Sequence, residues 1–220
     1  ISHGDVNGIS YEIIIKALAD KRINDLFTPI VYGSSKVANY HKNLIDQQDF
    51  NFNLIKSPEK ANGNKANILE LFDKEINLDI GKSTTEAGEA AFQALEKITL
   101  DLHNEEIDVL VTAPINKKNM QQADFAFPGH TEYLESKLDG ESLMILMTEK
   151  LRIGLITGHI PVSEISNAIT PELIKKKVQI LYNTLIKDFA ISKPKIALLG
   201  LNPHCGDNGV IGNEDDEVIR

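Results

Sequence analysis

Three apolar segments of the chain are each followed by a loop that carries a histidine beside glycine or proline. Residues 108–113 lead on to His130, residues 151–157 end just before His159, and residues 196–201 end just before His204. Short apolar runs bounded by glycine or proline are typical of buried strands. Open α/β sheets bind ligands beyond the carboxyl ends of their strands, so we expect these three loops to lie near a binding site.

Helical patterns alternate with the strand candidates. Helices are predicted at residues 9–20, 34–44, 84–103, 131–138 and 171–189, and a further strand at residues 27–32. Thr170 is expected to cap the last helix, with Pro171 at its first position. Only Glu149 and Lys150 separate residues 143–148 from residues 151–157, which predicts a β-hairpin. The alternation indicates an α/β fold, a layered α/β/α arrangement with a mixed sheet.

Composition excludes several classes of function. The chain has 220 residues, of which 42% are hydrophobic, which is enough to bury a sizeable core. A formal net charge of -9 argues against a nucleic-acid or anionic-membrane partner. Cys205 is the single cysteine, so no internal disulfide is possible, which fits a cytoplasmic protein. No apolar run approaches the length that spans a membrane.

Imidazoles at the ends of several strands are a plausible way to build a divalent-metal site. The histidines are too far apart in the sequence to form a ligand-spacing motif, and each could instead be a polar side chain with an ordinary partner. His41 and His103 lie in or beside polar helical segments, and we expect both to be solvated. His3 precedes Gly4 and Asp5, where the start of a helix could bind an anion or Asp5 could simply order the turn.

Charged residues near these loops have simpler interpretations. Lys117 and Lys118 could neutralise a phosphate or carboxylate, but we expect them to be solvated loop charges. The acidic residues Asp207, Glu214, Asp215 and Asp216 are typical of the first turn of a helix. His130 and Thr131 stand at the start of a predicted helix, where free N–H groups favour an anion. The alternative is that Thr131 is only the N-cap of that helix.

Several motifs together resemble those of the 4-hydroxythreonine-4-phosphate dehydrogenases, the PdxA family, and they occur in that family's order. Gly129-His-Thr-Glu132 matches the family's Gly-His-Thr-Glu, and residues 200–207 resemble its Gly-Leu-Asn-Pro-His-Ala-Gly-Glu. Residues 4–9, 112–117 and 151–161 resemble three further motifs, and Ala168-Ile-Thr170 recurs as well. In the first motif, Val6 and Asn7 replace the family's Pro-Ala, and Ser10 and Tyr11 replace its Gly-Pro.

The resemblance implies a fold like that of the isocitrate and isopropylmalate dehydrogenases, which bind NAD without a Gly-x-Gly-x-x-Gly motif. It implies a homodimer with the active site near the subunit interface. It also implies that His159 and His204 ligate a divalent metal such as zinc, magnesium or cobalt, and that His130 and Thr131 contact a phosphorylated amino-acid substrate. The general base and the NAD-binding residues stay unassigned. The family's C-terminal segment, with its third metal histidine, has no counterpart here, so residues 1–220 are expected to be part of a longer, two-lobed dehydrogenase truncated at both ends.

The implied reaction is NAD-dependent oxidation of 4-phosphooxy-L-threonine. Decarboxylation to 3-amino-2-oxopropyl phosphate would follow, in the biosynthesis of pyridoxal 5'-phosphate. One alternative is a sister dehydrogenase that acts on 4-phospho-D-threonate or 4-phospho-D-erythronate. Another is a metal-dependent phosphatase, which would also need histidines and a phosphate site. A third is an inactive fragment that only dimerises.

Overall fold

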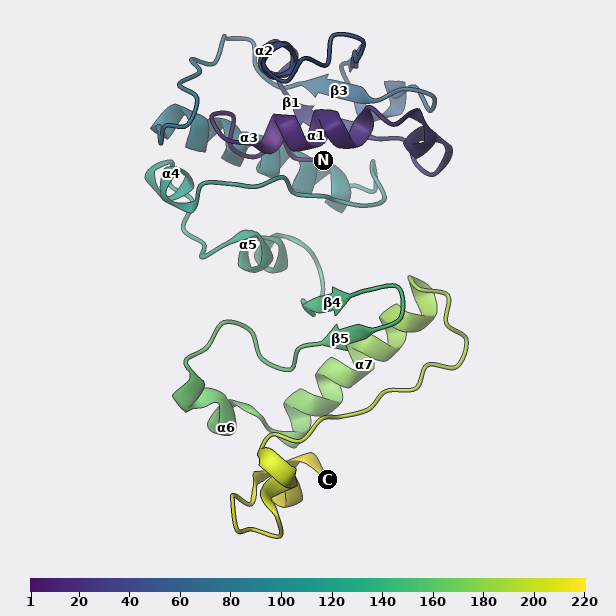
Figure 1. Ribbon diagram of the computed structural model, residues 1–220, viewed down its shortest axis with the longest axis vertical. Helices are drawn as coiled ribbons and strands as arrows, with labels where there is room; N and C mark the ends of the chain where they lie inside the picture. The colour runs from purple at the N-terminus through teal and green to yellow at the C-terminus, as the bar shows by residue number, and fades with distance from the viewer. The chain divides into compact units, whose positions relative to one another are not determined.

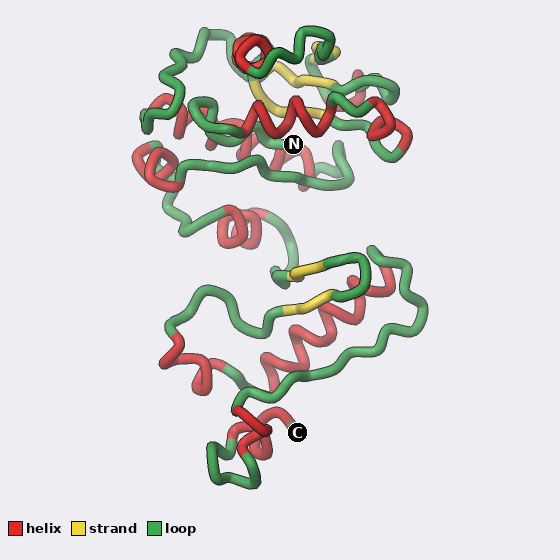
Figure 2. The backbone as a smooth tube through the Cα atoms, viewed as in Figure 1, coloured by secondary structure: helices red, strands yellow, loops and turns green.

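The computed structural model describes all residues from 1 to 220. It divides into two compact units, Ile1–Gly140 and Glu141–Arg220. The first unit contains a parallel sheet with helices on both faces, and the second contains a hairpin and one long helix (Figure 1). Much of the second unit is irregular chain, as the tube in Figure 2 makes plain. None of the helices combines the length and the apolar composition that crossing a bilayer requires.

The first unit is built from eight main elements. The helices are α1 (Ser10–Leu18), α2 (Ser35–Leu44), α3 (Thr85–His103), α4 (Lys117–Gln122) and α5 (His130–Lys137). The strands are β1 (Ile30–Gly33), β2 (Asn53–Ile55) and β3 (Asn67–Glu70), in the order β1-β3-β2 and all parallel. Short 3-10 turns η1 (Lys21–Asp25) and η2 (Pro58–Lys60) complete it.

Alternation along the strands creates the layers of this unit. Val31 and Ile68 are paired in register and belong to the core formed with α1 and α2. Tyr32 and Leu69, one residue further along each strand, belong to the core formed with α3. Successive side chains of a strand point to opposite faces, so the sheet lies between two helical layers. The predicted α/β class with layered helices is confirmed.

The second unit contains β4 (Ile145–Met147), β5 (Arg152–Gly154), α6 (Ile165–Ala168) and α7 (Pro171–Lys187), with turns η3 (Val162–Glu164), η4 (Pro203–Gly206) and η5 (Asp215–Ile219). The predicted hairpin is confirmed, since β4 and β5 pair antiparallel with Leu146 opposite Ile153. The Thr170 hydroxyl accepts the N–H of Leu173 at 3.2 Å, so the predicted cap of α7 is also confirmed.

Two predicted strands differ in the structure. Residues 196–201 are irregular and Leu199 is 83% exposed. A strand requires a neighbour for its N–H and C=O groups, and no segment of the chain pairs with this one. In residues 108–113 only Thr112 forms a bridge, to Ser2. The parallel strands and the hairpin form two separate sheets, whereas the sequence predicts a single mixed sheet.

Candidate functional site

The start of helix α5 carries a histidine with an unsatisfied ring nitrogen. Gly129 is the N-cap of the helix, and His130 is its first residue. The Nε2 atom of His130 is buried and has no hydrogen-bond partner. A buried polar atom without a partner costs free energy, so such an atom at a helix start suits a ligand that supplies one. Burial lowers the pKa of His130, and the nearby Lys117 ammonium lowers it further.

Lys117 lies beside this helix start. It is the first residue of α4, and its Nζ is 3.8 Å from the point where a Cβ on Gly129 would sit. The carboxylate of Glu132 is 3.4 Å from the same point, so a negative charge also lies nearby. Lys117 is exposed, as predicted, yet its ammonium is placed next to the candidate site.

Thr131 is the second residue of α5 and is exposed. The alternative that it is only the N-cap is wrong, because Gly129 occupies that position and no side chain caps the helix. The Thr131 hydroxyl is therefore not used for capping. The free N–H groups at the helix start, the hydroxyl, the imidazole and the Lys117 ammonium together form a surface that can bind an anion.

The loop of residues 4–9, which forms the first sequence motif, is hydrogen-bonded to the residues just before α4. The Ser10 hydroxyl donates to the carbonyl of Pro114 at 2.7 Å, and the N–H of Asp5 donates to the same oxygen at 2.9 Å. Gly4 has a φ of 66°, and a Cβ there would lie 2.3 Å from that oxygen. Only glycine tolerates both conditions, which explains this residue in the loop.

For the segment after His3, the sequence allowed either an anion site or a turn ordered by Asp5, and the structure favours the turn. The Asp5 carboxylate accepts the N–H of Asn7 at 3.0 Å, so Asp5 orders the turn. His3 is completely buried in the core and faces no solvent that could carry an anion.

His41, which the sequence predicts to be solvated, is also buried, and this prediction is wrong. Its Nε2 donates to the carbonyl of Val6 at 2.8 Å and its ring stacks on Tyr11, so it supports the same loop. His103 is exposed, as predicted.

The two candidate metal ligands both belong to the second unit. His159 follows β5, His204 lies in η4, and both side chains are exposed. No group of three or more histidine, cysteine, aspartate or glutamate side chains is gathered to hold a metal ion. Imidazole nitrogens are suitable ligands for zinc or cobalt, so the donor type fits. Their number is below the three protein ligands that are typical of catalytic zinc.

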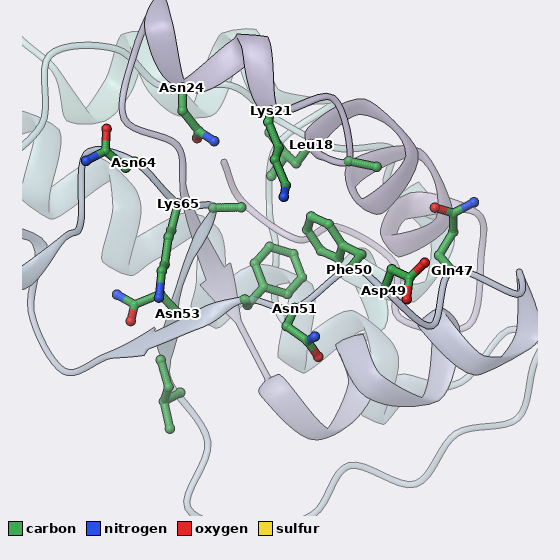
Figure 3. Close-up of a pocket in the computed structure, with 14 residues that line it drawn as sticks. Leu18, Lys21, Asn24, Gln47, Asp49, Phe50, Asn51, Asn53, Asn64 and Lys65 are labelled. Carbon is green, nitrogen blue, oxygen red and sulfur yellow. The ribbon is translucent and has the colours of Figure 1, made fainter.

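A surface pocket of the first unit does not coincide with these residues. It has a volume of about 580 Å³ and is lined by Leu18, Ala19, two residues of η1, Gln47, residues 49–54 and residues 64–66 (Figure 3). Five of its lining side chains are amides, and two lysines, Lys21 and Lys65, and two aromatic rings, Phe50 and Phe52, also line it. None of the histidines discussed above lines it, so it is not part of the candidate site.

These features define an α/β protein with a candidate anion site at a helix start and with exposed histidines in two further loops. Residues 25–220 match the family model described as "Pyridoxal phosphate biosynthetic protein PdxA". The chain belongs to the PdxA family, and the resemblance noted from its motifs is confirmed.

Curated relatives and solved structures agree with this assignment. A 4-hydroxythreonine-4-phosphate dehydrogenase of Bacteroides thetaiotaomicron is 46% identical over 100% of this chain. The chain spans 60% of the length of that relative. A D-threonate 4-phosphate dehydrogenase of Cupriavidus necator is 33% identical over 99% of this chain and 66% of its own length. The crystal structure of a 4-hydroxythreonine-4-phosphate dehydrogenase from Burkholderia phymatum has a TM-score of 0.86 at 28% identity, covering 99% of this chain and 67% of that one.

Proposed function

We propose that this protein is an NAD-dependent and metal-dependent dehydrogenase of a phosphorylated hydroxy acid, with 4-phosphooxy-L-threonine as its substrate. The observation that carries the proposal is the buried, unpartnered Nε2 of His130 at the start of α5, with Lys117 beside it. A phosphate group would supply the missing acceptor. The names of the relatives support the same substrate class, since one is a 4-hydroxythreonine-4-phosphate dehydrogenase and another a D-threonate 4-phosphate dehydrogenase.

The residues of the chain would have separate roles. His130 and Thr131 bind the phosphate with the N–H groups of the helix start, and Lys117 balances part of its charge. His159 and His204 hold the divalent ion, whether zinc, magnesium or cobalt. The ion, when bound, would polarise the substrate hydroxyl and lower its pKa. The phosphate contacts orient the carbon that bears this hydroxyl.

The proposed reaction balances as an oxidation followed by loss of CO2. NAD, when bound, would accept the hydride of the carbinol carbon, and the hydroxyl would lose its proton, so that a β-keto acid would result. Cleavage of the bond to the carboxylate then releases CO2, and the remaining carbon takes up a proton. The product is 3-amino-2-oxopropyl phosphate, which would serve the biosynthesis of pyridoxal 5'-phosphate.

The proposed homodimer is supported by the outer face of the hairpin. Leu146 and Ile153 lie directly opposite one another and are 56% and 41% exposed. Leu151, two residues before Ile153 and on the same face of its strand, is 56% exposed. Exposed apolar side chains gathered on one face are typical of a surface that another chain covers.

Two alternatives use the same residues. A dehydrogenase of 4-phospho-D-threonate or 4-phospho-D-erythronate would bind the phosphate in the same manner, and the Cupriavidus necator relative favours it as the second candidate. A metal-dependent phosphatase would need the same phosphate contacts. The test is to supply each of the three phosphorylated acids with NAD and zinc to the protein at its natural length, and to follow NADH at 340 nm and phosphate release. NADH formation with 4-phosphooxy-L-threonine alone supports the proposal. NADH with only another acid, or phosphate release without NADH, overturns it.

A further inference from the structure

We propose that Asp215 is a positioning residue that fixes the loop presenting His204. The proposal rests on the proposed function in one respect, namely that His204 is a metal ligand. Asp215 is only 2% exposed. One of its carboxylate oxygens accepts the backbone N–H of Leu201 at 2.8 Å, and the other accepts the N–H of Asn202 at 2.9 Å. Both oxygens thus hold the backbone just before the Pro203-His204 turn.

Neighbouring contacts strengthen this attachment. The Glu214 carboxylate accepts the side-chain amide of Asn202 at 2.8 Å, and the Asn202 carbonyl accepts the N–H of Cys205 at 3.1 Å. A Cβ on Gly200 would lie 3.0 Å from Oδ1 of Asp215 and 2.9 Å from Sγ of Cys205. Glycine at position 200 therefore lets the carboxylate approach the backbone closely. Glu214, Asp215 and Asp216 do begin a helical turn, as predicted, whereas Asp207 is instead the C-cap of η4. Glu214 and Asp215 are also used to hold this loop.

The loop needs such support because its backbone is strained. His204 has a φ of 52° and Cys205 a φ of 51°, both in the left-handed region. Residues other than glycine rarely adopt this conformation, and each such residue persists only where its surroundings fix it. The hydrogen bonds to Asp215 end at Asn202, two residues before His204. We infer that the carboxylate holds the chain in the conformation that turns this imidazole outward.

The chain supplies a matched control for the test. Asp216 is the next residue, is exposed, and pairs with Arg220 at 2.5 Å instead of contacting the loop. Asp215→Asn removes the charge and places an amide donor against an N–H group. Asp216→Asn removes the same charge without touching Leu201 or Asn202. Gly200→Ala tests the same contact from the loop, because the added Cβ would crowd Oδ1 of Asp215 and displace the carboxylate.

The experiment measures three quantities on the protein at its natural length. They are amide hydrogen exchange at Leu201 and Asn202, the Kd for zinc, and the melting temperature. Asp215→Asn and Gly200→Ala should each speed exchange at these two amides and weaken zinc binding by about tenfold or more, since a hydrogen bond to a charged group is lost. Asp216→Asn should match the wild type in all three.

The outcomes separate the positioning role from the proposed metal site. Wild-type exchange and zinc affinity in Asp215→Asn would overturn the positioning role. A loss of zinc affinity that merely follows a general loss of melting temperature in both variants would overturn it as well. If the wild type itself binds no zinc, the metal role of His204 fails. Faster exchange at Leu201 and Asn202 in Asp215→Asn would then still support the attachment of the loop, and unchanged exchange would overturn it.

Discussion

The Tyr11 hydroxyl donates a hydrogen bond of 2.9 Å to Nδ1 of His3 inside the core of the first unit. The direction follows from the other ring nitrogen, because Nε2 of His3 lies 3.0 Å from the carbonyl of Ala90 and must donate to it. The hydroxyl in turn accepts the N–H of Ser34 at 2.8 Å. His3 is thereby held neutral, and burial lowers its pKa to about 4.

This relationship predicts that acid destabilises the first unit. The unfolded chain binds a proton on His3 near pH 6.5, whereas the folded chain does so only near pH 4. The stabilisation is fully present above pH 6.5 and is lost as the pH falls from 6.5 to 4, at a cost of roughly 3 kcal/mol. Urea unfolding at a series of pH values gives the free energy of unfolding of the wild type and of His3→Gln. Between pH 6.5 and 4 this free energy should fall more steeply with decreasing pH in the wild type than in His3→Gln. His103→Gln, at an exposed position, should follow the wild type. Parallel curves for His3→Gln and the wild type would contradict the prediction.

Replacing His130 by alanine should mainly weaken substrate binding. Loss of a hydrogen bond to a charged group costs about 1.5–3 kcal/mol, so KM should rise roughly ten- to a hundredfold. Metal content should stay intact, because the proposed ligands lie elsewhere. Steady-state kinetics and metal analysis of the purified variant measure both. A variant that loses its metal while keeping its KM would show that the roles of the histidines are exchanged.

Lys117 and Lys118 form a matched pair for testing the charge beside His130. Lys117→Met should raise KM for the phosphorylated substrate and should also raise the pKa of His130, because the ammonium lowers that pKa. Lys118→Met removes the same charge from the next position, and we expect it to change neither value. NMR titration of the His130 ring gives the pKa without any turnover. Equal effects of the two substitutions would mean that only the general charge of the surface matters.

Gly88→Ala should destabilise the protein, although alanine is the better helix former by about 1 kcal/mol. Gly88 lies in α3 where α4 packs against it, and a Cβ there would be 2.2 Å from the carbonyl oxygen of Asn119. Overpacking of this kind costs about 1–3 kcal/mol. Gly63→Ala, whose Cβ would make only an ordinary contact with Thr28, should stay within about 0.5 kcal/mol of the wild type. Chemical denaturation of both variants measures the difference, and a stabilised Gly88→Ala would show that the two helices separate easily.

Local sequence patterns correctly predicted the elements that are determined by residues close to one another in the chain. The alanine-rich face of α3, the Thr170 cap of α7 and the two-residue turn of the hairpin are of this kind. The α/β class followed from their alternation. The strand at residues 196–201 could not be judged in this way, because its formation depends on a partner strand that no local pattern reveals.

The candidate site shows the same limit. His130 was found from its place at a helix start, and the sequence could not reveal that its Nε2 is buried without a partner. His41 has a carbonyl partner 35 positions earlier in the chain. The polar sequence around it does not reveal this partner and therefore led to the wrong prediction of its exposure. Asp215 was assigned to a helical turn, and its contacts with the loop before His204 depend on a fold of the chain that spacing does not encode.

The stoichiometry of the reaction tests the central claim most directly. The protein at its natural length, with zinc and NAD, is given a limiting amount of 4-phosphooxy-L-threonine, and NADH, CO2 and free phosphate are measured after completion. The account predicts one NADH and one CO2 for each substrate molecule and no free phosphate. Release of phosphate without NADH would contradict it.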